Sequence, residues 1–319
     1  MSVQRDRLHI AVGVILDQAT DTVLVARRPE HLHLGGLLEF PGGKLDPGEH
    51  VRDALARELR EELNINVTRA RPLIQINHDY TNESVLLDVW LVTDWSGEAE
   101  GMEDQEIMWL QKAALSKAEF PVANRPIITA VNLPAVYGIT PDLPQYDNRF
   151  FTRLERILDN GLKLLQFRSK QLDEQSKLSV LQEIFNMCRD NHCRLLINGV
   201  AGKTMLDFAN GVHLTGRDLM SLDQRPLAQD HLVAASCHNL AEIEQAGRIG
   251  VDFAVLSPVN KTTSHENTEP IGWSGFSGLV QACNLPVYAL GGIKTTDMDK
   301  AISCGGQGIA MISGLFNQL

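Results

Sequence analysis

The sequence lacks the features that mark membrane-spanning proteins, exported proteins and proteins with structural zinc sites. It contains no run of about eighteen apolar residues and no signal-peptide pattern. We therefore expect a cytoplasmic protein with no membrane partner. Its five cysteines are odd in number and have no zinc-ribbon spacing, so we interpret them as reduced thiols. No internal repeat or low-complexity segment is evident.

Positively charged residues are also fewer than negatively charged ones. The chain has 29 Lys and Arg residues against 40 Asp and Glu residues, a formal net charge of −11. This balance disfavours a role in coating nucleic acid, so we expect no nucleic-acid partner. Small anionic substrates would instead be held by local cations. A length of 319 residues exceeds one typical domain and suits two.

The pattern of strand-like and helix-like segments changes near residue 132, which predicts one domain at 1–131 and a second at 132–319. In the first part, strand-like runs surround one helical stretch, which predicts an α+β fold. In the second part, strands alternate with helices, which predicts an α/β fold of the (β/α)8 TIM-barrel type. The candidate barrel strands are 135–139, 162–167, 194–198, 212–214, 232–235, 253–257, 286–290 and 308–312.

The stretch 39–65, EFPGGKLDPGEHVRDALARELREELNI, crowds Glu58, Glu61 and Glu62 into one helical turn. Like charges three or four residues apart cost a helix roughly 0.2–0.5 kcal/mol for each uncompensated pair. Positive charge is therefore expected beside them. Arg57 and Arg60 could supply part of it, as on an ordinary solvated, salt-bridged helix face.

Two further features favour a cation at this place. Glycine turns before the helix can aim backbone carbonyls at an ion. An apolar stripe fixes the direction of the glutamates, through Val51, Leu55, Leu59 and Leu63. Carboxylates anchored beside such a loop suit Mg²⁺ or Mn²⁺, which take oxygen ligands and leave room for substrate phosphates.

This stretch resembles the Nudix box of pyrophosphohydrolases. The likeness is carried by Gly43, Glu49 and the run 57–65, RELREELNI. The single departure is Asn64, where the family pattern has glycine. Because asparagine also tolerates a left-handed helix end, the helix can still stop there.

The likeness extends over residues 8 to 130 and narrows to the MutT branch, whose members clear oxidised guanine nucleotides. It is carried by 9–15, 27–28, 38–43 and 120–127. The resemblance implies a nucleotide substrate, with 8-oxo-dGTP hydrolysed to 8-oxo-dGMP and diphosphate. It further implies that Asn124 binds the purine edge, that Phe40 lines the base pocket and that Arg28 contacts the nucleotide. An amide offers a donor and an acceptor together, which suits Asn124 to this role.

The metal ligands implied are Glu58, Glu62, the carbonyl of Gly42 and Glu106, which resembles a carboxylate that MutT-like enzymes bring from a distant loop. Glu61 is the alternative ligand. Either Glu58 or Glu106 could take the proton from the attacking water. We expect Arg57 to pair with a glutamate and orient it.

The second half resembles thiamine phosphate synthase and its TenI relatives. The likeness is carried by 166–170, 196–198, 211–214, 257–258, 262–263 and 291–293. It implies that Arg168 and Lys170, two apart on one strand, bind pyrophosphate, and that Gln166 also belongs to the ligand-binding residues. The amides of Gly291 and Gly292 would form a phosphate cradle with Ser313.

Three departures from the synthase pattern predict a barrel that binds ligand without catalysis. Gly199 stands where the synthase has a metal-binding aspartate, which leaves Asp218 as the other carboxylate. His265 replaces a lysine, and Pro258 stands where the TenI tautomerases have a histidine. A thiamine-precursor ligand is therefore expected in this domain. Two alternatives remain open: a hydrolase of pyrimidine or thiamine-type pyrophosphates, and a barrel that only senses ligand.

Overall fold

The structure is a computed structural model that describes residues 7–31, 34–80, 83–102, 105–262 and 269–316. The chain forms two compact units, Met1–Asn132 and Leu133–Leu319. None of the helices within the described ranges combines the length and the apolar character that a bilayer crossing requires.

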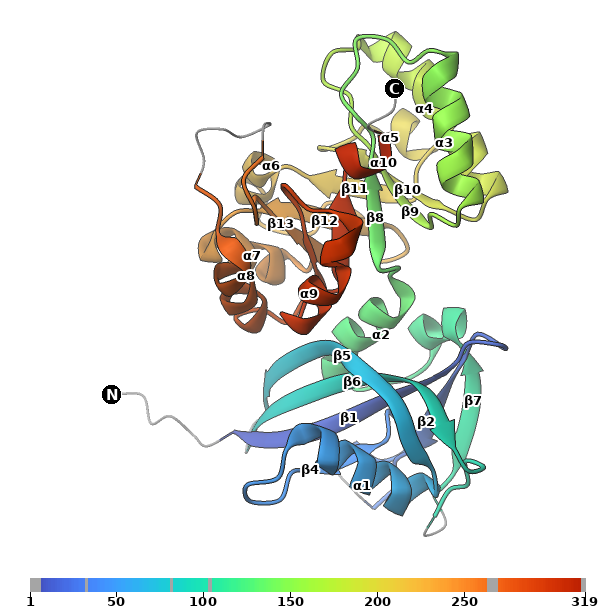
Figure 1. The fold of residues 1–319 in the computed structure, drawn as a ribbon, viewed down its shortest axis with the longest axis vertical. Coiled ribbons are helices and arrows are strands. Elements are labelled where there is room, and N and C mark those ends of the chain that lie inside the picture. The colour runs from blue at the N-terminus through green and yellow to red at the C-terminus, as the bar shows by residue number, and fades with distance from the viewer. Residues whose placement is uncertain (1–6, 32–33, 81–82, 103–104, 263–268, 317–319) are drawn as a thin grey trace. The chain divides into compact units, whose positions relative to one another are not determined.

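The first unit is built on a mixed seven-stranded sheet (Figure 1). The strand order is β3-β2-β1-β6-β5, with β4 paired to β1 and β7 paired to β2. The parallel pairing of β1 with β6 makes the sheet mixed. The strands are β1 (Leu8–Asp17), β2 (Thr22–Arg27), β3 (Leu38–Glu39), β4 (Gly42–Lys44), β5 (Asn66–Asp79), β6 (Ser84–Ser96) and β7 (Ile107–Gln111).

Helix α1 (Val51–Leu63) packs on one face of this sheet through its apolar stripe. Leu55, Leu59 and Leu63 are buried, whereas Val51 at the first turn is only half-buried. The helix ends at Asn64, whose φ of 56° and ψ of 27° are left-handed. The expectation that asparagine can replace glycine at this cap is confirmed.

The opposite face of the sheet is covered by helix α2 (Arg125–Asn132), which buries Ile127, Ile128 and Val131. Two short 3-10 helices precede it, η1 (Lys112–Lys117) and η2 (Val122–Asn124). With α1 and α2 on its two faces, the sheet forms the middle layer of an α+β unit, as predicted from the sequence.

The second unit is a closed barrel of eight parallel strands, as predicted (Figure 1). Neighbouring strands follow the order β10-β11-β12-β13-β14-β15-β8-β9. The strands are β8 (Val136–Ile139), β9 (Leu164–Phe167), β10 (Arg194–Asn198), β11 (Gly211–Leu214), β12 (Leu232–Cys237), β13 (Phe253–Leu256), β14 (Val287–Ala289) and β15 (Gly308–Met311).

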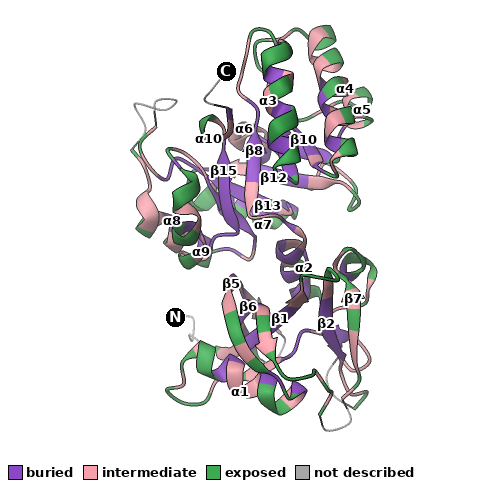
Figure 2. Cartoon of the chain, turned by 45° about the vertical axis from the view of Figure 1, so that its right-hand side comes forward, coloured by how far each residue is buried: buried purple, intermediate pink, exposed green. Residues whose placement is uncertain are grey.

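The barrel interior is packed with side chains, including the mutually contacting rings of Tyr137, Phe253 and Tyr288. Figure 2 shows the strands buried and the helices exposed on their outer sides. The helices are α3 (Asn148–Asp159), α4 (Glu174–Asp190), α5 (Lys203–Leu206), α6 (Gly216–Ser221), α7 (Leu240–Ile249), α8 (Gly272–Gln281), η4 (Thr295–Asp297), α9 (Met298–Ser303) and α10 (Ser313–Phe316). In barrels of this kind, functional groups gather at the carboxyl ends of the strands.

Candidate active site

The glutamates of α1 meet the glycine turn that precedes the helix. A Cβ atom at Gly43 would overlap the carboxylate of Glu58, and one at Gly42 would overlap the carbonyl of Ala11. The backbone N–H of Gly42 donates to Oε2 of Glu62 at 3.0 Å. Gly43 therefore lets strand β4 lie directly against the Glu58 carboxylate, and Gly42 lets it lie close to strand β1.

Arg57 binds three of the neighbouring glutamates. Its Nη1 donates to Glu58 at 2.8 Å and to Glu61 at 3.3 Å, while its Nε and Nη2 donate to Glu49. The hydrogen bonds to Glu49 and Glu58 raise the pKa of Arg57, so the guanidinium stays charged. Among the described residues, Arg60 forms no ion pair with these glutamates, and its Nε donates to Oδ1 of Asn66 at 2.9 Å.

Glu62 is the most strongly perturbed carboxyl of the cluster. Its pKa is raised to about 7, chiefly by burial and in smaller part by the nearby charges of Glu58, Glu39 and Glu61, whereas the Gly42 N–H acts in the opposite direction. A buried carboxylate surrounded by like charges is stabilised by a cation.

A cavity of about 470 Å³ is lined by these acidic side chains. Glu58, Glu61 and Glu62 reach it from α1, and Glu106 reaches it from the residue before β7. The Glu106 carboxylate accepts a hydrogen bond from Nε of Arg27 at 2.8 Å. The structure therefore brings all four predicted acidic residues to one cavity, although they come from segments more than forty residues apart in the chain.

The donor set of this cavity fits a hard divalent cation. Among the described residues, no group of three or more His, Cys, Asp or Glu side chains is placed so that it could hold a metal ion by itself. Mg²⁺ does not require such a cage, because it is commonly held by one or two carboxylates, waters and substrate phosphates. Glu58 and Glu62, one helical turn apart beside the Gly42 backbone, could supply that set.

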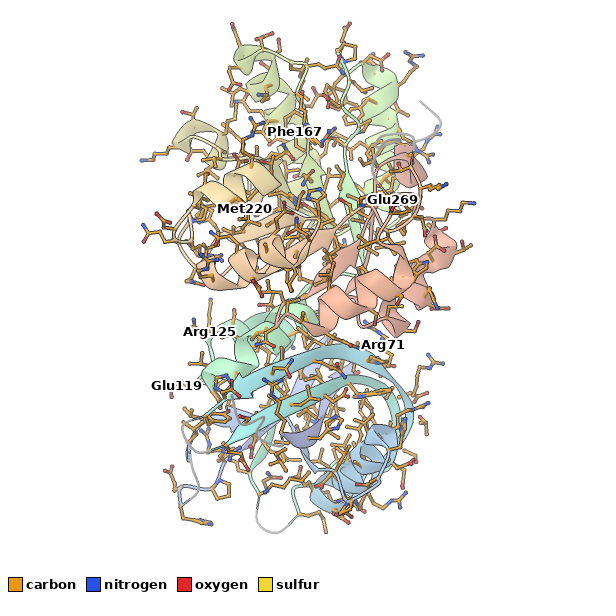
Figure 3. All side chains as sticks on the ribbon, turned by 90° about the vertical axis from the view of Figure 1, so that its left-hand side faces the viewer. Arg71, Glu119, Arg125, Phe167, Met220 and Glu269 are labelled. Atoms are coloured by element: carbon orange, nitrogen blue, oxygen red, sulfur yellow. The ribbon has the colours of Figure 1, made fainter. Side chains whose placement is uncertain are left out.

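A second cavity, of about 860 Å³, is lined by apolar and aromatic residues with a few polar groups. Phe40 and Asn124 both line it, and Phe40 stacks on Phe120 with ring centroids 5.1 Å apart. Asn124 is only 8% exposed. Glu119 and Arg125, labelled in Figure 3, flank the segment 120–124 that carries Phe120 and Asn124. A cavity of this size accommodates a nucleoside.

Arg28 lines both cavities and is bound to Glu39. Glu39 is absent from the candidates predicted above. Its signal in the sequence is its position immediately before Phe40, on the short strand β3 that pairs with β2.

In the barrel, Gln166 is buried and its Nε2 donates to the hydroxyl of Tyr137 at 3.3 Å. The prediction that Arg168 and Lys170 lie on one strand is wrong, because β9 ends at Phe167. The loop after the strand is fixed by hydrogen bonds: the Arg168 N–H donates to Oγ1 of Thr140, and the Lys170 N–H donates to Asp142. The Arg168 guanidinium lies 3.9 Å from the Asp142 carboxylate.

The predicted phosphate cradle follows the last two strands of the barrel. Gly291 and Gly292, with φ of 94° and 61°, follow β14, and the exposed Ser313 begins α10 after β15. Among the described residues, no hydrogen bond or ion pair joins these three to Arg168 or Lys170. His265 and Thr263 lie outside the described residues.

At the carboxyl end of β10, Gly199 has a φ of 87°. A Cβ atom built on it would lie 3.6 Å from Oδ2 of Asp218 and would meet no other atom within 4 Å. In the structure, that Asp218 oxygen accepts hydrogen bonds from the Thr215 N–H and hydroxyl, closing the capping box of α6.

Comparison with known families accounts for both units. The NUDIX domain profile matches residues 11–130, and the thiamine monophosphate synthase profile matches residues 136–315. The chain belongs to the Nudix family in its first unit and to the thiamine monophosphate synthase family in its second. The resemblances predicted from the sequence are confirmed.

Three curated relatives illustrate this double membership. The putative thiamine-phosphate synthase 2 of Aquifex aeolicus is 33% identical over 183 residues, covering 57% of this chain and 98% of the relative. The match to the 8-oxo-dGTP diphosphatase of Escherichia coli is 35% identical and covers 38% of this chain and 94% of the relative. The match to the 8-oxo-dGTP diphosphatase of Proteus vulgaris is 44% identical and covers 30% of this chain and 85% of the relative.

The first unit is therefore a Nudix hydrolase. Nudix hydrolases act with a divalent metal ion, in agreement with the donor set of the acidic cavity. Both families indicate small phosphorylated molecules as substrates or ligands.

Proposed function

We propose that the first unit hydrolyses 8-oxo-dGTP to 8-oxo-dGMP and diphosphate. The observation that carries the proposal is the buried amide of Asn124 in the cavity that Phe40 lines, next to the acidic cavity across Arg28. A nucleotide with its base in the larger cavity could extend its phosphates toward Glu58 and Glu62.

The oxidised base differs from guanine at the edge that an amide can read. Guanine presents two neighbouring acceptors, N7 and O6, in its major-groove edge. Oxidation at C8 places a hydrogen on N7, so the edge becomes one donor beside one acceptor. The Asn124 amide offers one acceptor and one donor group, and it therefore matches the oxidised edge with two hydrogen bonds.

The acidic cavity would supply the rest of the reaction. Glu58, Glu62, the Gly42 carbonyl and Glu106 would hold Mg²⁺ or Mn²⁺, with Glu61 as the alternative ligand. The bound ion would neutralise the phosphoanhydride oxygens and lower the pKa of water. Arg57 would orient Glu58, and Glu58 or Glu106 would accept the proton of the attacking water.

Steady-state kinetics of the full chain with Mg²⁺ and with Mn²⁺ test this proposal. The substrates are 8-oxo-dGTP, dGTP and hydroxymethylpyrimidine pyrophosphate. We expect kcat/KM to be highest for 8-oxo-dGTP, with diphosphate as the second product. A higher value for the pyrimidine pyrophosphate would instead support the alternative of a hydrolase for thiamine-type pyrophosphates, in keeping with the attached barrel.

We further propose that the barrel binds a phosphorylated thiamine precursor without making thiamine phosphate, and so acts as a ligand-sensing module. Gly199 supports this proposal, because the carboxylate expected beside Asp218 is missing there. A departing pyrophosphate needs a cation, and one carboxylate is a weak magnesium site. Calorimetry with thiamine phosphate and with hydroxymethylpyrimidine pyrophosphate, beside a synthase assay, should show binding without turnover. Synthase turnover, or binding unaffected by Arg168→Ala, would contradict it.

A further inference from the structure

A charge pair lies at the boundary between the two cavities of the first unit. Nη1 of Arg28 donates to Oε2 of Glu39, and the two side chains are 29% and 22% exposed. Within the described part of the chain, Arg28 is the one residue that lines both cavities, whereas Glu39 lines only the larger one.

The backbone places the two residues on paired segments. Strands β2 and β3 are antiparallel, with Ala26 opposite Glu39, and the Arg28 N–H donates to the carbonyl of Leu37 at 2.9 Å. This pairing fixes the Cα atom of Arg28 but not its long side chain, which has many rotamers. The ion pair with Glu39 is one of the contacts that place the guanidinium.

The alternative position for the guanidinium is among the metal-binding carboxylates. Glu58, Glu61 and Glu62 line the cavity on the other side of Arg28. An arginine that turned toward them would neutralise the charge that a divalent cation needs. The neighbouring Arg27 is held separately, by Glu106 and by the carbonyl of Gly36.

We propose that Glu39 is a positioning residue that holds Arg28 on the base side of the boundary. There Arg28 can contact the nucleotide while the glutamates of α1 remain available to the metal ion. The inference rests on the proposed function, because it requires a nucleotide that occupies both cavities. It assigns to Glu39 a role that acts through Arg28 and not through direct contact with the reacting atoms.

A double-mutant cycle in the full chain tests this role, using the wild type, Glu39→Gln, Arg28→Met and the double variant. Two quantities are measured: kcat/KM for nucleotide, and the affinity for Mn²⁺ without nucleotide. Glu39→Gln should lower each on the order of tenfold in the wild-type background. In the Arg28→Met background the same substitution should change each less than about twofold, because interacting residues are not additive.

Glu98→Gln is the control, because Glu98 is an exposed carboxylate of the first unit that lines neither cavity. It should change both quantities less than about twofold, since interactions of exposed charges are weakened by water. Glu39→Asp retains the charge on a shorter side chain and should lie between the wild type and Glu39→Gln, which provides a second test if Glu39→Gln does not fold.

Two outcomes would overturn the inference. Equal losses from Glu39→Gln in both backgrounds would show that Glu39 acts without Arg28. Unchanged Mn²⁺ affinity in Glu39→Gln would show that Arg28 does not compete with the metal ion. If 8-oxo-dGTP is not the preferred substrate, the wild type will show equal kcat/KM for 8-oxo-dGTP and dGTP. The Mn²⁺ affinity does not depend on turnover, so it tests the role of Glu39 separately.

Discussion

Gly43 lies so close to Glu58 that a single added methyl group would occupy the place of the Glu58 carboxylate. A larger residue at position 43 would require the Glu58 carboxylate to move, so the glycine turn and this glutamate are structurally coupled. The same turn donates the Gly42 N–H to Glu62. This arrangement fixes two carboxylates, one helical turn apart, against a strand.

Replacement of Glu62 by glutamine should reduce kcat by a factor on the order of 10² or more, because it removes a buried charge while keeping the shape. Steady-state turnover with saturating Mg²⁺ measures this effect. Glu61→Gln is the matched control and should lose less activity, since the Glu61 side chain is 60% exposed. A larger loss in Glu61→Gln than in Glu62→Gln would make Glu61 the ligand.

Replacement of Asn124 by alanine should remove the preference for the oxidised base and leave metal affinity unchanged. A bidentate contact to a base edge contributes about 1–3 kcal/mol of discrimination. The ratio of kcat/KM for 8-oxo-dGTP to that for dGTP should therefore fall by on the order of tenfold or more. If kcat/KM for both nucleotides falls by the same factor, Asn124 is not the residue that reads the base.

The sequence predicted the architecture well because burial leaves a periodic trace. The predicted strand 194–198 coincides with β10, whose central residues Leu195 to Ile197 are buried. The predicted strand 162–167 also ends where β9 ends, at Phe167, but the placement of Arg168 and Lys170 on one strand was wrong. The course of the chain after Phe167 involves a contact with Thr140, which accepts the Arg168 N–H from 28 residues away and leaves no periodic pattern in the sequence.

The site shows the same division. The glutamates of α1 were predictable because helical spacing places them on one face. The contacts around them were not predictable. The Arg28–Glu39 pair depends on the pairing of β2 with β3, and Arg60 donates to Asn66, which lies beyond the end of α1. The spacing of residues in the sequence indicates which face of a helix or strand each residue occupies. Which residues contact each other is decided by the three-dimensional packing.

His213 should make the stability of the barrel unit depend on pH. It is buried between the Tyr137 hydroxyl, 3.0 Å from Nδ1, and Oγ of Ser236, 2.8 Å from Nε2. Burial lowers its pKa to about 3. Below the ordinary value of about 6.5, the unfolded chain binds a proton that the folded chain does not, so the free energy of unfolding falls as the pH falls.

The expected slope is up to about 1.4 kcal/mol per pH unit between roughly pH 6.5 and 3. Urea unfolding followed by circular dichroism at pH 7.5 and 5.5 measures it in the wild type and in His213→Gln. The variant lacks the titrating group, so its free energy of unfolding should depend less on pH over this interval. The first unit is identical in both proteins and cancels in the comparison. An equal pH dependence in the two proteins would contradict the assignment to His213.

Gly199→Asp should restore a cation site at the mouth of the barrel. The new Cβ atom would lie 3.6 Å from Oδ2 of Asp218, in otherwise open space, so two carboxylates could share an ion. The φ of 87° strains most side chains, but aspartate is among the residues that enter the left-handed region most readily. Gly199→Asn tests the backbone effect with the same shape and no charge.

We expect Gly199→Asp to bind Mg²⁺ in the presence of pyrophosphate at least about tenfold more tightly than Gly199→Asn, since an added carboxylate ligand supplies a full negative charge. Calorimetry with pyrophosphate and Mg²⁺ measures this difference, with Glu62→Gln present in every protein to weaken the metal site of the first unit. The gain should disappear in Gly199→Asp combined with Asp218→Asn, because the ion then has one carboxylate again. Equal Mg²⁺ affinity in the aspartate and asparagine variants would show that Gly199 does not stand at a lost ligand position, and the proposal of a non-synthetic barrel would lose its support from this residue.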